Sequence, residues 1–320
     1  MLSFHRAVEH EFAAVNQLII ERLESGVDMV ENIGHYIVDS GGKRLRPVVV
    51  LLSALACGYR GDKHLPLAAI IEFIHTATLL HDDVVDTSSL RRGKPTANAE
   101  FGNAPSVLVG DFLYSRAFQM LVELGSMEVM AIMANATNII SEGEVQQLIN
   151  AGNPDLTELQ YYEVINKKTA KLFEAGAEAG AVLANVNAEL RTALREYGHH
   201  LGMAFQIMDD VLDYAGDSAV IGKNVGDDLA EGKLTLPLIY LLSFGDAVDI
   251  SLVHDAITER SAERFSEILE AVNNSGALAY TRDAANKQVA LAIEALEPLA
   301  ESNYKTVMVE LAKFAVSRDH

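Results

Sequence analysis

The feature that most constrains this chain is an acidic pattern, Asp-Asp-x-x-Asp, which occurs twice, at residues 82–86 and 209–213. Each copy lies in a long apolar stretch, IIEFIHTATLLHDDVVD for the first and MAFQIMDDVLDY for the second. Neither stretch has Pro or Gly close before its acids, so both are predicted to be helices. On a helix the first and last acids of each copy are four residues apart and project from one face.

Like-charged pairs at this spacing destabilise a helix by roughly 0.2–0.5 kcal/mol each, so something must offset the repulsion. Mg²⁺ does so, because it takes oxygen ligands and is usually held by one or two carboxylates together with substrate phosphates. One such cluster is equally consistent with a solvated acidic face. Two clusters of identical spacing, both in apolar helices, favour metal binding.

The rest of the chain shows no sign of a linker between domains. It has 320 residues with only 7 Pro, and apolar residues recur at helical period almost to the C-terminus. A hydrophobic content of 49% is ample for a large core. The sequence therefore predicts one all-α domain over residues 1–320.

Charge and cysteine content exclude several classes of protein. A formal charge of −20 argues against nucleic acid as a partner, although a small phosphorylated ligand remains compatible if metals or local basic clusters supply positive charge. Cys57 is the only cysteine, so no intramolecular disulfide forms. The N-terminal segment lacks a clean apolar signal region, and the longest uncharged run, residues 47–59, is too short to span a membrane. We expect a cytoplasmic protein with no integral membrane segment.

Basic residues gather before one long apolar helix. Lys43, Arg44 and Arg46 follow a Gly-Gly pair and precede Pro47. Glycine lets a backbone approach a ligand closely, Pro is tolerated in a first helical turn, and a helix N-terminus attracts anions. The segment predicts an anion site, and an ordinary basic helix start explains it equally well.

A second basic group, RRGKP at residues 91–95, comes five residues after the first acidic cluster. Its Gly and Pro predict that the helix ends there, with Arg91 and Arg92 on a loop beside the acids. Guanidinium groups bind phosphate oxygens in bidentate fashion, which suits a diphosphate. An alternative is that the arginines only neutralise the aspartates, but that leaves the following turn, GKPTAN, unexplained.

The stretch after the second cluster, GDSAVIGKNVGDDLAEGKLTLP, is typical of a mobile loop over a site. Lys223 and Lys233 in this loop are within reach of phosphates held near Asp209. Asp227 and Asp228 are better explained as a solvated turn or as partners of those lysines than as metal ligands.

Four polar residues interrupt apolar helical patterns: Lys168, Thr169, Gln206 and His75. Taken singly, each is most often a satisfied polar residue of a core. His75 lies seven residues before Asp82, two helical turns back on the same stripe, and a lone His there is more often structural than a ligand.

Taken together, these segments resemble the trans-polyprenyl diphosphate synthases. The resemblance runs from about residue 41 to 237 and rests on GGKRLRP, LLHDDVVDTSSLRRGKPTAN, KTAKLF, FQIMDDVLDYAGD and GKNVGDDLAEGK. GEVQQL and VGDFLYSRAFQM resemble the long-chain branch of that family. One departure is Leu234, where many members have Pro; it lies beside Lys233 and replaces no ligand.

The resemblance implies an all-α isoprenoid synthase bundle around a deep central cavity, with Mg²⁺ held by Asp82, Asp86 and Asp209. It implies that oxygen dipoles of Thr169 and Gln206 stabilise an allylic carbocation. The implied contacts of the allylic diphosphate are Arg91, Lys168, Lys223 and Lys233, and those of isopentenyl diphosphate are Lys43, Arg46, His75 and Arg92.

The implied reaction adds isopentenyl diphosphate repeatedly to an allylic primer, expected to be farnesyl diphosphate, in a homodimeric enzyme. Small residues just before the first acidic cluster, Ala77 and Thr78, leave room for a growing tail. We therefore expect a product near octaprenyl diphosphate, as used for quinone side chains. Met120 is a candidate floor of the tunnel, although Met at helical spacing is more often plain core, and close helix packing also explains Ala77.

Two other functions compete with this interpretation. A terpene cyclase would usually carry a different second metal motif and would not need the pocket implied for Lys43, Arg46 and His75. A non-catalytic partner subunit would lack complete acidic motifs, whereas both motifs are complete here.

Overall fold

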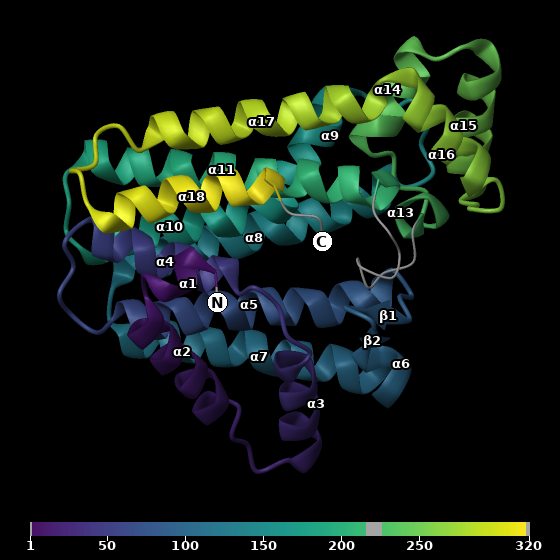
Figure 1. Cartoon of the computed structure of the whole chain (residues 1–320). Coiled ribbons are helices and arrows are strands. Elements are labelled where there is room, and N and C mark those ends of the chain that lie inside the picture. Colours follow the sequence, from purple (N-terminus) through teal and green to yellow (C-terminus); the bar gives the residue numbers. More distant parts are fainter. Residues whose placement is uncertain (1, 216–225, 318–320) are drawn as a thin grey trace. The chain divides into compact units, whose positions relative to one another are not determined.

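The computed structural model describes residues 2–215 and 226–317. Helices dominate it, and the only strands in these ranges are a pair of two residues each (Figure 1). The prediction of an all-α fold is confirmed. The elements are α1 Ser3–Arg6, α2 Glu9–Arg22, α3 Asp28–Asp39, α4 Leu45–Ala56, α5 His64–Val85, β1 Leu90–Arg91, β2 Lys94–Pro95, α6 Ala97–Phe101, α7 Asn103–Leu124, α8 Met127–Asn150, α9 Glu158–Ile165, the π-helical turn η1 Asn166–Ala170, α10 Lys171–Leu183, α11 Ala188–Ala215, α13 Asp227–Ala230, α14 Leu236–Phe244, α15 Ala247–Glu259, α16 Phe265–Ser275, α17 Ala277–Ala295 and α18 Asn303–Ser317.

The chain divides into two compact units. Unit 1 comprises Met1–Thr137, Leu172–Gly198 and Ile293–Leu311, and unit 2 comprises Asn138–Lys171, His199–Ala292 and Ala312–His320. The single domain over residues 1–320 stays a prediction. The first acidic cluster belongs to unit 1 and the second to unit 2.

Unit 1 is built around α5, which packs along α7 and is flanked by α4 and α2 (Figure 1). The apolar run Val48–Leu52 in α4 is almost wholly buried, as the predicted core requires. Arg44, directly before α4, adopts the left-handed conformation with φ 44° and ψ 46°, and Pro47 lies in the first turn. The basic loop therefore turns sharply into a helix N-terminus.

The first acidic helix ends earlier than its sequence predicts. We expected the end at Gly93 and Pro95, but α5 ends at Val85 with Asp86 as its C-cap. Thr87 has a positive φ of 52°, which breaks the helical path, and the Ser88 N–H donates to the Asp83 carbonyl. The arginines that were expected on an irregular loop lie instead on and beside the β1–β2 hairpin, whose register pairs Arg91 with Lys94.

Unit 2 has its own apolar core, in which α14 packs against α15 and α16. Leu234, the residue that departs from the family pattern, is 4% exposed and belongs to this core. Helix α9 begins with a capping box between Thr157 and Gln160, and it continues into the π-helical turn η1 before α10. A π-turn has one residue more than an α-turn and often occurs at functional sites.

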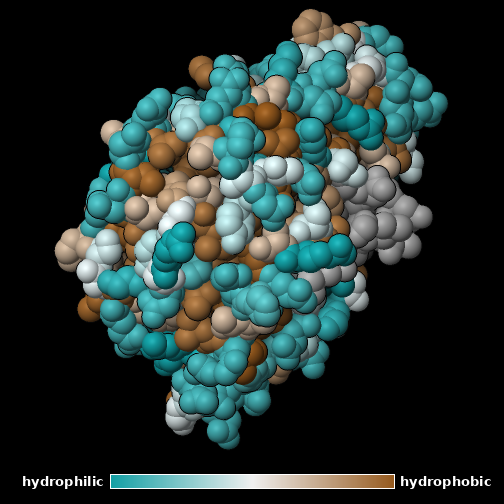
Figure 2. Space-filling view, turned by 60° about the vertical axis from the view of Figure 1, so that its left-hand side comes forward, coloured by the Kyte–Doolittle hydropathy of each residue, from teal (hydrophilic) through white to brown (hydrophobic). Residues whose placement is uncertain are grey.

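In the described ranges, no helix combines the length and apolarity that crossing a membrane requires. Figure 2 shows a face on which hydrophobic residues are interspersed among hydrophilic ones. Among the exposed apolar side chains are Leu108 and Val122 of α7, which are 66% and 70% exposed.

Candidate active site

The acids of the first cluster divide into two kinds. Asp82 and Asp86 are half-buried, and the Asp86 N–H donates to the Asp82 carbonyl at 2.8 Å, so the four-residue spacing is kept to the end of α5. Asp83, about 100° further round the helix, is only 1% exposed. The middle acid therefore lies in the protein while the outer two remain partly accessible.

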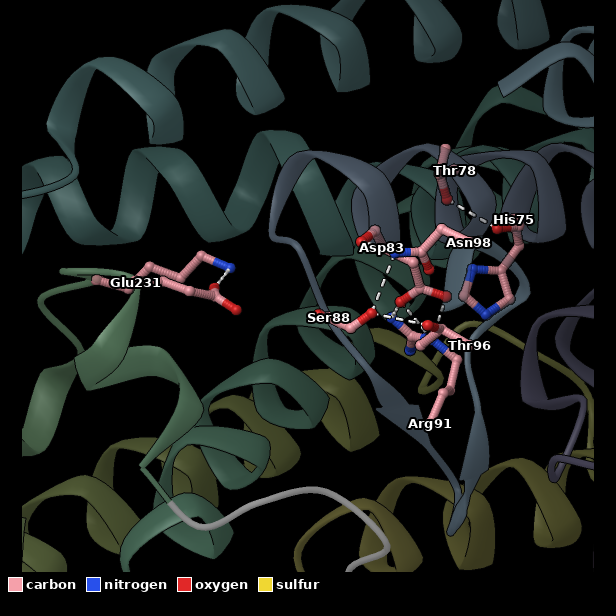
Figure 3. Close-up of polar contacts among 9 residues, drawn as sticks. His75, Thr78, Asp83, Ser88, Arg91, Thr96, Asn98 and Glu231 are labelled. Atoms are coloured by element: carbon pink, nitrogen blue, oxygen red, sulfur yellow. Dashed lines mark hydrogen bonds and ion pairs between the residues drawn. The ribbon is translucent and has the colours of Figure 1, made fainter. Parts of the chain in front are cut away.

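Asp83 is bound to Arg91. The Arg91 Nε donates to both carboxylate oxygens, at 2.9 and 3.1 Å, and Nη2 donates to Oδ1 at 2.6 Å (Figure 3). Burial works to lower the pKa of Arg91, but the hydrogen bonds and charge of Asp83, together with the charges of Asp82 and Asp86, raise it. Arg91 is thus a permanent cation held beside the outer acids.

Further hydrogen bonds fasten the hairpin to the end of α5. Thr96 Oγ1 donates to the Ser88 carbonyl at 2.7 Å, and Asn98 Nδ2 donates to the carbonyls of Asp83 and Ser88 at 3.1 and 3.2 Å (Figure 3). These contacts fix the backbone on both sides of the arginines. The position of Arg91 is therefore set by side chain and backbone together.

Arg92 occupies the turn of the hairpin with a positive φ of 53°. Its guanidinium atoms lie within 2.6–2.7 Å of the point that a Cβ on Gly42 would occupy. Gly42 itself has φ +130°, so glycine is needed there for its backbone conformation, and a Cβ would also displace the Arg92 guanidinium. The two basic segments that the sequence separates by some fifty residues thus meet in unit 1.

Arg46 and His75 also come together. Arg46 Nη1 lies 3.1 Å from His75 Nε2, and its guanidinium stacks over the Phe173 ring at 4.5 Å. Burial, and then the charges of Arg46, Arg92 and Arg91, hold the pKa of His75 well below its usual range. A neutral imidazole is required, because arginine only donates and Nε2 must accept. His75 therefore orients Arg46.

One half-buried acid of this basic region, Glu72 of α5, had no counterpart in the sequence prediction. The Glu72 carboxylate lies 3.9 Å from Arg44 Nε. Burial raises its pKa, against the lowering effect of the charges of Arg44, Arg46 and Arg92. Lys43 is half-buried in the same loop, and its carbonyl lies 2.8 Å from His5 Nε2.

The second cluster, on α11, repeats the division of the first. Asp209 and Asp213 are half-buried, whereas Asp210 is 3% exposed. Asp210 accepts hydrogen bonds from Tyr161 Oη at 2.6 Å and from Gln206 Nε2 at 2.9 Å. Burial, followed by the charge of Asp228, raises the pKa of Asp210 to about 8, and the two hydrogen bonds oppose that shift.

Thr169 and Gln206, which were expected to act together, are hydrogen-bonded in unit 2. Thr169 Oγ1 donates to Gln206 Oε1 at 2.8 Å. Thr169 is 7% exposed and Gln206 half-buried. Apart from the family resemblance, the sequence shows each only as an isolated polar residue in an apolar helical pattern.

The π-turn η1 carries both Lys168 and Thr169. Lys168 Nζ forms an ion pair with Glu144 Oε2 of α8 at 2.7 Å. At neighbouring Gly143 a Cβ would lie 2.8 Å from Lys167 Cβ and 2.9 Å from the Lys168 nitrogen. The glycine of the GEVQQL segment therefore lets the π-turn pack directly on α8.

Of the two lysines predicted in the loop after the second cluster, Lys223 lies outside the described residues. Lys233 is described; its Nζ forms an ion pair with Glu231, which Figure 3 labels. Its backbone N–H donates to the Asp228 carbonyl at 2.8 Å.

The residues expected to govern chain length lie on α5. Ala77 is fully buried, and Thr78 Oγ1 donates to the His75 carbonyl at 2.8 Å (Figure 3). Met120 of α7 is 1% exposed. Their role in chain length stays a prediction.

The donor set fits a hard divalent cation. The outer acids Asp82, Asp86 and Asp209 offer half-buried carboxylates, which are the oxygen ligands that Mg²⁺ prefers. In residues 2–215 and 226–317 no three acidic, His or Cys side chains converge as a complete ion site. Mg²⁺ is usually held by only one or two carboxylates, with waters and substrate phosphates as its other ligands.

The all-α fold and these residues are those expected of an enzyme that binds diphosphates. A family model described as polyprenyl synthetase matches residues 27–274. The octaprenyl diphosphate synthase of Escherichia coli (strain K12) is 50% identical over 310 residues, covering 97% of this chain and 96% of the relative. The all-trans-nonaprenyl-diphosphate synthase (geranyl-diphosphate specific) of Rhodobacter capsulatus is 46% identical over 312 residues, covering 97% and 96%.

A solved structure is also similar over nearly the whole chain. The polyprenyl synthase of Caulobacter crescentus CB15, complexed with calcium and isoprenyl diphosphate, has a TM-score of 0.97 and 44% identity, covering 99% of this chain and 97% of that one. The chain belongs to the polyprenyl synthetase family. It is accordingly a trans-prenyltransferase of isoprenoid biosynthesis, and the resemblance predicted from its motifs is confirmed.

Proposed function

We propose that this enzyme adds isopentenyl diphosphate units to farnesyl diphosphate and releases a product near octaprenyl diphosphate, for quinone side chains. The observation that carries the proposal is the repeated division of the acidic clusters, in which Asp82, Asp86 and Asp209 are half-buried while the middle acids are bound internally. The name and 50% identity of the Escherichia coli relative support the octaprenyl length. The nonaprenyl name of the Rhodobacter relative makes a neighbouring length the main competitor.

We assign Asp82, Asp86 and Asp209 to Mg²⁺. When bound, the metal supplies Lewis-acid stabilisation of the charge that develops on the leaving diphosphate. Arg91 is pre-positioned by Asp83 to add a cationic donor, and Lys168, Lys223 and Lys233 assist at the same diphosphate. Isopentenyl diphosphate binds at Lys43, Arg46, His75 and Arg92, where the Arg46–His75 contact orients the guanidinium.

The allylic C–O bond breaks first, and its electron pair leaves with the diphosphate. The cation left on the allylic carbon is stabilised by the oxygen dipoles of Thr169 and Gln206. The isopentenyl double bond then attacks that carbon, and the proton lost in restoring a double bond goes to the departing diphosphate. Each cycle therefore lengthens the chain by one unit and releases one diphosphate.

The test is incubation of the purified enzyme with labelled isopentenyl diphosphate, Mg²⁺ and either farnesyl or geranyl diphosphate, followed by chromatography of the dephosphorylated products. We expect the farnesyl primer to be preferred and octaprenol to dominate. A dominant nonaprenol product, or strict preference for the geranyl primer, refutes the proposed length or primer. The Asp82→Ala variant is the control, and near-normal turnover at saturating Mg²⁺ would refute the metal assignment.

We also infer a cytoplasmic homodimer. Leu108 and Val122 leave apolar surface on α7 that a second copy can cover. Analytical ultracentrifugation at micromolar concentration is expected to give twice the mass of one chain. A fully active monomer contradicts the dimer.

A further inference from the structure

Four side chains of unit 2 form a continuous hydrogen-bonded chain. Thr169 Oγ1 donates to Gln206 Oε1 at 2.8 Å, Gln206 Nε2 donates to Asp210 Oδ1 at 2.9 Å, and Tyr161 Oη donates to Asp210 Oδ2 at 2.6 Å. In its ionised form, Asp210 therefore has both oxygens occupied as acceptors. Every hydrogen bond in the chain donates toward Asp210.

This direction fixes which way the Gln206 amide faces. The amide has one acceptor end and one donor end, and the ionised Asp210, which only accepts, takes the donor end. Oε1 is then turned to Thr169, which must donate its only hydroxyl proton to it. The lone pairs of Thr169 Oγ1 are left for another contact, and a group of this kind stabilises positive charge.

The opposite direction would have the opposite effect. If the amide were reversed, its N–H would face Thr169, and the hydroxyl would have to accept. Its proton would then be free to point at the substrate, where it would repel a carbocation. The chemistry proposed for Thr169 therefore depends on the orientation of an amide that Thr169 cannot set by itself.

We propose that Tyr161 and Asp210 are positioning residues, which set the direction of this hydrogen-bonded chain so that Thr169 presents oxygen lone pairs to the allylic cation. The inference deepens the proposed function and rests on its assignment of Thr169. It gives the middle acid of the second motif a role apart from metal binding. It also gives a role to Tyr161, a 4% exposed tyrosine on α9 that lies outside every motif of the sequence.

The test is a double-mutant cycle on the first condensation step, with Tyr161→Phe and Thr169→Val. Tyr161→Phe removes one hydroxyl and keeps the ring. We expect it to lower kcat roughly tenfold, as for the loss of a hydrogen bond to a charged group, with the KM of both diphosphates and the Mg²⁺ half-saturation within about twofold of wild type. Thr169→Val should lower kcat more, by about 10², while Thr169→Ser restores most of it.

The decisive result is the coupling. Because Tyr161 acts through the Thr169 hydroxyl, Tyr161→Phe should have almost no further effect in the Thr169→Val background. The proposal is overturned if the kcat losses of the two single variants multiply in the double variant. It is also overturned if Tyr161→Phe leaves kcat unchanged, or if a rise in its Mg²⁺ half-saturation accounts for the lower kcat. If Tyr161→Phe does not fold, Asp210→Asn replaces it in the same cycle with the same expectation.

Tyr162→Phe is the matched control. Its ring lies against that of Tyr161 with centroids 5.4 Å apart, but its hydroxyl hydrogen-bonds to Glu158 instead of Asp210. We expect wild-type kcat from it, and an equal loss in both variants would mark a general packing effect and contradict the proposal. The cycle measures only the first condensation. An unexpected final chain length therefore refutes the proposed product but does not affect the coupling measured between Tyr161 and Thr169.

Discussion

Neighbouring aspartates of the first motif should have opposite phenotypes when replaced by alanine. Asp83→Ala removes the carboxylate that binds Arg91 through three contacts of 2.6–3.1 Å. Asp82→Ala removes one member of a like-charged pair on α5. We predict that the first change costs mainly stability and the second mainly turnover.

The magnitudes follow from burial. Breaking a buried ion pair by removing one partner costs roughly 3–5 kcal/mol, because the other charge is left without compensation. Arg91 retains 20% exposure of its side chain, so we expect the lower end, about 3 kcal/mol. Asp82→Ala relieves a repulsion of roughly 0.2–0.5 kcal/mol and should leave the free energy of unfolding almost unchanged.

Urea denaturation followed by circular dichroism at 222 nm measures both variants. With a denaturant slope of roughly 3 kcal/mol/M, Asp83→Ala should shift the midpoint by about 1 M. A rescue variant sharpens the test: Asp83→Ala combined with Arg91→Met removes the stranded charge and should regain most of the lost stability. Equal stability of the two single variants, or no regain in the double variant, would refute the reasoning.

Three further predictions concern other parts of the chain. Burial raises the pKa of Cys57 to about 11, so only about one thiol in 10³ is ionised at pH 8. Iodoacetamide should therefore label the native protein far more slowly than the urea-unfolded protein, and the labelling rate of the native protein should rise as the pH approaches 11. Gly143→Ala forces a methyl group against the backbone of the π-turn, so it should lower kcat and reduce the melting temperature by several degrees. The control is Ala134→Gly, at an exposed position of the same helix, which should leave kcat unchanged. Ala77→Tyr should give an active enzyme with products only one or two units longer than the primer; unchanged product length with lower stability would point to overpacking instead.

Much of this architecture could be predicted from the sequence, because it depends on local periodicity. The helices that carry the two acidic clusters follow from apolar runs without Pro or Gly, and the turn into α4 follows from its Gly-Gly and Pro residues. The end of α5 was predicted too late, since a left-handed Thr87 stops the helix where no glycine or proline stands. A threonine rarely adopts a positive φ, so the sequence does not predict one at Thr87. The backbone conformation after α5 is set instead by the tertiary contacts of Asp83 and Asn98.

The partners of the site residues could not be predicted, because they depend on contacts between distant segments. Nothing in the sequence pairs Tyr161 with Asp210, which lie 49 residues apart, or places Arg46 on Phe173. Glu72 gave no signal either, because one acid in an apolar helix resembles any other surface residue. Gly143 had a signal in the GEVQQL segment, but the reason for it, the close approach of the π-turn, is visible only in the fold.

The internal division of the Asp-Asp-x-x-Asp pattern explains why two adjacent acids occur at all. Two carboxylates that bind one metal from a helix need only be four residues apart, as the first and last acids of the motif are, because such residues share a face. The additional acid is turned about 100° away, into the protein, and in each unit it binds a residue to which the proposed function assigns a role in the reaction. Asp83 holds the cation Arg91, and Asp210 holds the amide of Gln206. Under the proposed function, the motif therefore combines two roles at adjacent positions: one face of the helix offers metal ligands, and the next fixes the residues assigned to the diphosphate and to the carbocation.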